Sequence, residues 1–339
     1  YFIIASTTSY YNLTGDSRYM TLLREQVDGL SAEIDTSPAG MLQDYPGECY
    51  PADVMSAIAC IRRADRVLGS DHSAFAERAS RAFTGKSLDP LGLPPYLAEI
   101  RSGEPITGAR GCSNSYVCTV APEVWPETAA AWYAAYEKSF WQYRWGAYGF
   151  REFPKDSGAS DWYGDVDSGP CVAGHGFAAC AFGLSAARAN GRFDHAYPLT
   201  QELVAICWPM MTGRMLLPQI LSNATDAPLL GEAAILYNLT RMPQAGVEVR
   251  KGGTTPTLLY VMIFAYFAAG ILLILSTVRS ARAKLAGDFR YPRSQFGFWA
   301  FFVAGGTAAL ITGHIAAGMT MILLAQFLPR TRRLQAEGV

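Results

Sequence analysis

Charge of either sign is scarce in this chain, and the two signs nearly cancel. Only 17% of the 339 residues are charged, and 28 basic against 29 acidic residues leave a formal net charge of −1. A nucleic-acid-binding protein needs a basic face to neutralise phosphates, so we expect no nucleic-acid partner. Half of the residues are apolar and 12% are aromatic, which is enough for a large core or an aromatic-lined pocket.

The usual signatures of cofactors and metals are also missing. The sequence contains no GxGxxG or GxxxxGK[ST] phosphate loop, no GxSxG elbow and no HExxH pair. Its seven cysteines form no CxxC pair and no zinc-finger spacing with histidine, so we expect neither a metal nor a cofactor. Cys112 and Cys118 either form a disulfide in an oxidising compartment or stay buried as free thiols.

Long apolar runs are present towards the C-terminus. Residues 257–278 carry no charge over 22 positions, which is about 33 Å of helix and enough to cross a bilayer. A second run, near 296–328, predicts either one long tilted helix or two short passes that turn near Gly313–His314. We therefore expect a helical domain over 1–245 and a membrane region over 246–339.

Basic residues flank both apolar runs. The connector Arg279–Arg293 carries five arginines and lysines against one aspartate, and the tail carries three more arginines. Short basic loops stay on the cytoplasmic side of a membrane. This pattern predicts an integral membrane protein, with the bilayer as a partner and the helical domain on the extracytoplasmic (periplasmic) side.

The first 245 residues show helical rather than alternating periodicity. Apolar residues recur at spacings of three and four over 52–68 and 126–145, and 169–190 has the composition of a tightly packed inner helix. Glycines followed by Ser or Asp end one helix and begin the next in the turns at 13–19, 68–73 and 190–196. The resulting helical hairpins predict an all-α fold, an (α/α)6-type toroid that is incomplete at its N-terminus because the chain opens inside a helical pattern.

Polar side chains are concentrated in the segments between the predicted hairpins, 43–53, 109–116 and 149–170. In a toroid these segments converge on one mouth. Several carboxylates beside aromatic rings can have separated pKa values, as general acid/base catalysis requires. The catalytic candidates are Asp44, Asp53, Asp165, Asp167 and His175. The candidates for substrate binding are Tyr45, Glu48, Tyr50, Arg110, Asn114, Tyr116, Arg151 and Glu152.

Each candidate also has a purely structural interpretation. Asp53 and Asp167 could each cap the helix that follows. Arg151 and Glu152 could form an ion pair with each other, and His175 could be a hydrogen-bonded histidine of the core.

Four stretches resemble the linalool dehydratase/isomerase family. The resemblance extends from Tyr1 to about Leu199 and implies an (α/α)6-barrel that hydrates or dehydrates small isoprenoid alcohols without a cofactor. The stretches are the helix ending in TGDSRY, the DTSPAG turn, the ADRVLGSD helix end and the WPETAAAWYAAYEKSF helix.

The family's active-site cysteines and histidine are not retained. The resemblance places the cysteines at Gln43 or Asp44 and at Asp53, and the histidine near Ile4. Carboxylates at the same mouth keep acid/base capability, and they also resemble the carboxylates of (α/α)6 glycoside hydrolases and polysaccharide lyases.

These observations favour a membrane-anchored enzyme that uses carboxylate acid/base chemistry. The predicted activity is of the lyase or hydratase–isomerase type on a small or lipidic alcohol. One alternative is a glycan-active hydrolase or lyase, and another is a non-catalytic binding module. A homo-oligomer or a partner in a membrane complex stays open.

Overall fold

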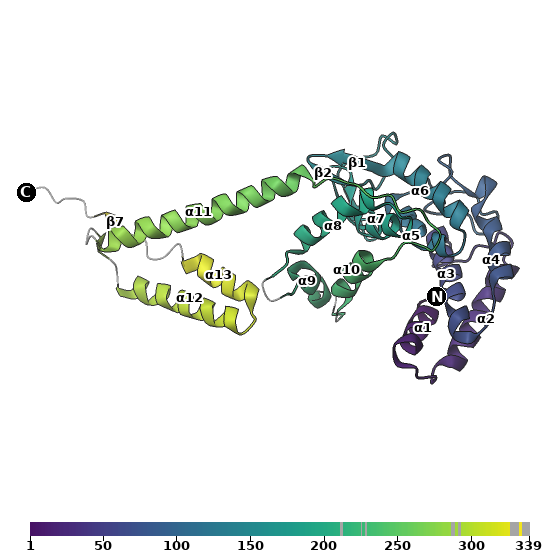
Figure 1. The fold of residues 1–339 in the computed structure, drawn as a ribbon, viewed down its shortest axis with the longest axis horizontal. Helices are drawn as coiled ribbons and strands as arrows, with labels where there is room; N and C mark the ends of the chain where they lie inside the picture. Colours follow the sequence, from purple (N-terminus) through teal and green to yellow (C-terminus); the bar gives the residue numbers. More distant parts are fainter. Residues whose placement is uncertain are drawn as a thin grey trace, which may run out of the picture. The chain divides into compact units, whose positions relative to one another are not determined.

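The computed structural model describes the chain except for residues 211, 212, 225, 228, 286–288, 291, 292, 326–331 and 334–339. Helix makes up 61% of it, in thirteen α-helices over the described part, which confirms the all-α class. The chain divides into two compact units, Tyr1–Leu259 and Tyr260–Val339. Figure 1 shows the elements of both units, coloured in sequence order.

The first unit is built from helices in two rows. In the inner row α1, α3, α5 and α7 pack one against the next, and α10 packs against α7. In the outer row α2 packs on α1 and α3, α6 on α5, and α8 on α7. The helices are α1 Phe2–Thr14, α2 Met20–Thr36, α3 Pro51–Leu68, α4 Ser73–Ala79, α5 Gly111–Val120, α6 Pro126–Phe140, α7 Phe177–Ala189, α8 Phe193–Cys207, α9 Leu216–Ala224 and α10 Leu230–Thr240, with short 3-10 helices η1 Ser80–Phe83, η2 Gly85–Ser87 and η3 Ala121–Glu123.

Glycines in the left-handed backbone region end three of the inner helices. Gly15 follows α1 with φ 69°, Gly69 follows α3 with φ 65°, and Gly191 follows α7 with φ 69°. A side chain is disfavoured at such a φ, so glycine stops the helix and lets the chain reverse. The glycine-terminated helix ends predicted at 13–19, 68–73 and 190–196 are confirmed. The predicted Ser or Asp caps of the next helices are wrong, because the N-caps of α2, α4 and α8 are Tyr19, His72 and Arg192 and none of them makes a side-chain capping hydrogen bond.

Short strands occupy a stretch where the sequence predicts none. The glycine-rich segment 169–190 is helical only from Phe177 onwards, so its prediction as one helix is wrong. Gly169 and Gly174 have φ of +62° and +83°, which a right-handed helix cannot accommodate. The strands are β1 Trp141–Arg144, β2 Ala147–Phe150, β3 Tyr163–Asp165, β4 Gly169–Val172 and β5 His175–Gly176, with β1 antiparallel to β2, and β4 antiparallel to both β3 and β5.

A glycine in α7 allows this helix to approach an aromatic core. A Cβ at Gly183 would lie 2.3 Å from Cδ2 of Phe150. Phe150 is fully buried and stacks on Tyr136 at 4.5 Å between ring centroids. Close packing therefore offsets the helix-weakening effect of this glycine.

The second unit contains most of α11, followed by two further helices. Gly313, with φ +83°, lies in the turn between α12 and α13, so the prediction of one long tilted helix there is wrong and the predicted turn is confirmed. The elements are α11 Thr257–Leu285, β6 Phe289–Arg290, α12 Arg293–Ile311, α13 Ile315–Ala325 and β7 Arg332–Arg333, with β6 antiparallel to β7.

The membrane prediction is contradicted. Within the described residues, no helix combines the length and the apolar character that crossing a bilayer requires. The run near 296–328 is divided between helices of 19 and 11 residues, whereas a span takes about 20. The predicted spans near 257–278 and 296–328 are therefore wrong, as is the integral-membrane localisation. The extracytoplasmic placement of the helical domain depends on these spans and loses its basis.

Candidate functional site

Two carboxylates lie at the N-terminal end of α3. Asp53 is in the first turn, and its Oδ1 accepts a 2.6 Å hydrogen bond from the Tyr1 hydroxyl. Asp44 is in the preceding loop, where its Oδ2 accepts a 2.9 Å hydrogen bond from the backbone N–H of Tyr50. The N-cap of α3 is Tyr50, and no side chain caps this helix. The interpretation of Asp53 as a helix cap is therefore wrong.

The electrostatics of this pair suit proton transfer. Partial burial of its carboxyl and the neighbouring Asp53 raise the pKa of Asp44 to about 6, although the hydrogen bond from Tyr50 opposes the rise. Asp44 as a residue is exposed, so its carboxyl can exchange protons with solvent. Burial and the hydrogen bond to Asp53 raise the pKa of the Tyr1 hydroxyl far above its usual range, so the phenol stays protonated.

The other two predicted segments meet on the guanidinium of Arg110. Its Nε donates to Oε1 of Glu152 at 2.7 Å, and its Nη2 donates to Oδ2 of Asp165 at 2.8 Å. The guanidinium carbon lies 4.3 Å from the ring centroid of Tyr96, whose hydroxyl donates to Asp167. Arg110 and Glu152 are 8% and 1% exposed, so this is a buried ion pair. Arg110 therefore neutralises the carboxylates of Glu152 and Asp165, whereas no described cation pairs with Asp44 or Asp53.

In this network the pKa of Glu152 is raised and the pKa of Asp165 is lowered. Burial raises the pKa of Glu152, although Arg110 opposes the rise. Burial also acts to raise the pKa of Asp165, but hydrogen bonds from Ser168 and from Arg110 outweigh it and lower the value. Asp165 Oδ1 accepts the backbone N–H groups of Asp167 and Ser168 in the β3–β4 turn. Asp167 thus belongs to a strand turn, and its interpretation as a helix cap is wrong.

Aromatic rings connect the two groups of carboxylates. The ring of Tyr50 lies 5.2 Å from the ring of Tyr96, centroid to centroid, in an edge-to-face arrangement. The Tyr50 hydroxyl donates to Oε2 of Glu48 at 2.6 Å. Tyr50 and Tyr96 therefore place the Asp44–Asp53 pair beside the Arg110 network.

Arg151 and His175 lie in a separate arrangement. Arg151 Nη2 donates to Oδ1 of Asp161 at 2.8 Å, so its predicted pairing with Glu152 is wrong. His175 is in β5 rather than in a helix, and its Nε2 lies 3.3 Å from the backbone oxygen of Arg144. Burial lowers the pKa of His175, which favours a neutral ring.

The remaining candidates have different surroundings. Asn114 is fully buried, and its Nδ2 donates to the backbone oxygens of Pro94 and Arg110, which fixes the start of α5. Tyr45 is 65% exposed. Tyr116 is partly buried on α5, and burial, with a smaller effect from Cys60 and Asp53, raises its pKa.

Sequence reasoning missed three residues of this region. Tyr1 binds Asp53, Tyr96 binds Asp167, and the backbone N–H of Cys112 donates to Oε2 of Glu152 at 3.1 Å. Tyr96 follows two prolines in a stretch without charge, so nothing in the sequence marks it as a partner of an acid. Cys112 and Cys118 lie on one helix and are free thiols, so the disulfide alternative is wrong.

Across the part of the chain that the structure describes, no group of three or more His, Cys, Asp or Glu side chains is placed to hold a metal ion. No protein-family model and no curated protein matches the chain. The resemblance to the linalool dehydratase/isomerase family therefore stays a prediction.

Proposed function

We propose that this chain is an enzyme of the hydratase–dehydratase or isomerase type that uses carboxylate acid/base chemistry on a small alcohol. The observation that carries the proposal is the Asp44–Asp53 pair. Asp53 contributes to the raised pKa of Asp44, and neither carboxylate forms an ion pair with a described residue. Glu152 and Asp165, by contrast, are bound by Arg110.

The pair supplies the two proton transfers that dehydration needs. Asp44, with a pKa of about 6, delivers its proton to the departing hydroxyl oxygen, the C–O bond breaks and water leaves. Asp53 takes the proton from the adjacent carbon as the C=C bond forms. The proton gained by Asp53 then returns to Asp44 through solvent, so the enzyme is regenerated. Hydration is the reverse sequence.

The arrangement of the helices supports a ring-type fold. In the inner row of α1, α3, α5, α7 and α10, successive helices pack together and have outer partners, as the hairpins of an (α/α)6-type toroid would. We propose that these hairpins form such a ring, with the Asp44–Asp53 pair at one mouth. A toroid places its active site among loops at one end of its helices. The loops before α3, α5 and α7 all carry acidic residues.

Exchange of the alcohol oxygen with water tests the proposed chemistry. Reversible dehydration in water enriched in heavy oxygen introduces the label into the alcohol, which mass spectrometry detects. Linalool, geraniol and tert-butyl alcohol are the probes. We expect labelling by the wild type, and a rate at least about 100-fold lower for Asp53→Asn, the size of one general acid/base contribution.

The matched control is Asp28→Asn, an exposed aspartate on α2. Its exchange rate should equal that of the wild type. Absence of labelling with all three alcohols, or an unchanged rate in Asp53→Asn, would overturn the proposal.

A second candidate function is a non-catalytic binding module. The ion pairs of Arg110 with Glu152 and Asp165, and of Arg151 with Asp161, favour it because they neutralise three carboxylates of the region. In that case the wild type, like the Asp44→Asn and Asp53→Asn variants, should show only the buffer background of oxygen exchange.

A further inference from the structure

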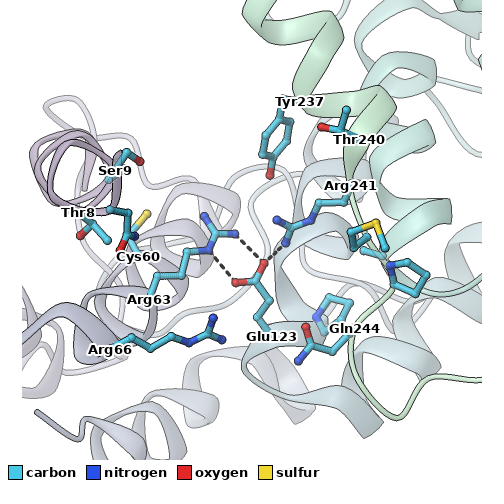
Figure 2. A pocket seen from close by; sticks show the side chains of 16 residues that line it. Thr8, Ser9, Cys60, Arg63, Arg66, Glu123, Tyr237, Thr240, Arg241 and Gln244 are labelled. Carbon is cyan, nitrogen blue, oxygen red and sulfur yellow. Dashed lines mark hydrogen bonds and ion pairs between the residues drawn. The ribbon is translucent and has the colours of Figure 1, made fainter. Parts of the chain in front are cut away.

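A pocket of about 610 Å³ lies at the C-terminal ends of α3, α5 and α10, beside one face of α1. Figure 2 shows its charged side chains. Arg63 and Arg66 come from α3, three positions apart and therefore on one face of the helix. Glu123 comes from η3, and Arg241 follows α10 directly.

The charges in this pocket do not cancel. Arg63 donates through Nε and Nη2 to both oxygens of Glu123, at 2.7 and 2.8 Å, and Arg241 binds the same carboxylate. In Figure 2 the two guanidinium groups approach Glu123 from opposite sides, and Arg66 points towards the same group. Arg66 forms no ion pair with any described residue. One carboxylate therefore faces three guanidinium groups, which leaves two positive charges in excess.

Two residues that line the pocket each carry a buried polar atom that has no partner among the described residues. Nε of Arg241 and Oγ1 of Thr8 are buried and accept or donate no hydrogen bond within the described structure. Thr8 is only 6% exposed. Buried polar groups are nearly always hydrogen-bonded, so two such atoms without partners beside a polar cavity indicate that a ligand is missing.

The surroundings of Arg241 point to an anion as that partner. Burial and the neighbouring Arg63 lower the pKa of Arg241 to about 10, which means that its positive charge is poorly compensated. An anion in the pocket would supply the missing compensation. Guanidinium groups bind phosphate oxygens in a forked geometry, and two excess charges match a phosphate dianion better than a single carboxylate.

We propose that this pocket binds a small molecule carrying a phosphate or diphosphate group, held by Arg63, Arg66 and Arg241. The hydroxyl group of Ser9 lies in the same lining and supplies a neutral donor, whereas the Thr240 hydroxyl already donates to the backbone oxygen of Leu236. The site does not depend on the Asp44–Asp53 chemistry. Along α3 its first arginine, Arg63, lies ten residues after Asp53, or about 15 Å away at the rise of a helix.

Isothermal titration calorimetry of the whole chain with pyrophosphate and with inorganic phosphate tests the site. We expect saturable binding of pyrophosphate that weakens as salt is added. Arg66→Gln should weaken it by about tenfold, which corresponds to about 1.4 kcal/mol. Arg66 is exposed and bears no described ion pair, so the variant should fold like the wild type.

Arg24→Gln is the matched control, because Arg24 is an exposed helical arginine on α2 outside the pocket. It should bind pyrophosphate like the wild type. Citrate, whose charged groups are all carboxylates, should bind more weakly than pyrophosphate. Absence of saturable binding at millimolar pyrophosphate, or equal affinity in Arg66→Gln and the wild type, would overturn the site. Citrate binding as tight as pyrophosphate binding would overturn the assignment to phosphate.

Discussion

The Tyr1 hydroxyl and the Asp53 carboxylate are joined by a 2.6 Å hydrogen bond between positions 52 residues apart. This bond connects the start of α1 to the first turn of α3, and the two helices pack together. Since the high pKa of Tyr1 keeps the phenol protonated, it donates to Oδ1 of Asp53. Tyr1 thus fixes the orientation of the carboxylate that we propose as the catalytic base.

Tyr1→Phe should slow the exchange of alcohol oxygen without unfolding the protein. A hydrogen bond to a charged group contributes about 1.5–3 kcal/mol, so a tenfold to 100-fold lower rate is expected. Tyr10→Phe is the control, because Tyr10 hydrogen-bonds to Asp16 away from the site. Equal rates in the two variants would show that Tyr1 does not position Asp53.

Glu152→Ala should destabilise the fold strongly. It leaves the buried Arg110 guanidinium without its Nε acceptor, and breaking one side of a buried ion pair costs about 3–5 kcal/mol. Glu104→Ala removes a surface partner of Lys86 and should change the unfolding free energy by less than about 1 kcal/mol. Urea unfolding measures both. Similar losses in the two variants would contradict the structural role of Glu152.

Glu202→Gln should remove a pH-dependent loss of stability. Burial raises the pKa of Glu202 from 4.5 to about 7, and the N–H of Tyr148 donates to its Oε1 at 2.7 Å. The folded state holds this proton more tightly than the unfolded chain, so the stabilisation is complete below about pH 4.5 and is lost as pH rises through about 7.

Glutamine keeps the acceptor oxygen and carries no charge. The variant should therefore be more stable than the wild type above pH 7, by on the order of 1–3 kcal/mol, and the difference should shrink towards pH 4. Thermal unfolding across this range measures it. A difference that does not vary with pH would argue against a buried, titrating Glu202.

Gly111→Ala should disrupt the junction between α5 and the segment after β2. A Cβ at Gly111 would lie 1.9 Å from the backbone oxygen of Arg151, which cannot move without breaking the local structure. We expect a loss of at least about 3 kcal/mol, as for severe overpacking. Gly29→Ala is the control: no atom lies within 4 Å of its Cβ position in α2, so it should stabilise by about 1 kcal/mol. Denaturant melts compare the two.

The helices of the first unit could be predicted because the residues that end them can be recognised in the local sequence. Gly15 and Gly69 end helices at a φ that other residues avoid, and apolar spacing identified α3 between them. The strands of 141–176 could not be predicted because each has at most four residues, too few for an alternation of polar and apolar residues to appear.

Ion-pair partners could not be predicted in the same way. Arg151 and Glu152 are adjacent in an extended segment, and successive side chains in such a segment point to opposite sides. Arg151 therefore reaches Asp161, and Glu152 reaches Arg110, which is 42 residues away. Such pairings depend on the tertiary fold.

Site-specific titration of the aspartate carboxyls by carbon-13 NMR examines the Asp44–Asp53 pair itself, because it needs no substrate. We expect Asp44 to titrate near pH 6 in the wild type, and Asp53→Asn to lower this value because it removes the neighbouring negative charge. An Asp44 that titrates near the ordinary value of 3.8, or that does not respond to Asp53→Asn, would contradict a coupled acid/base pair.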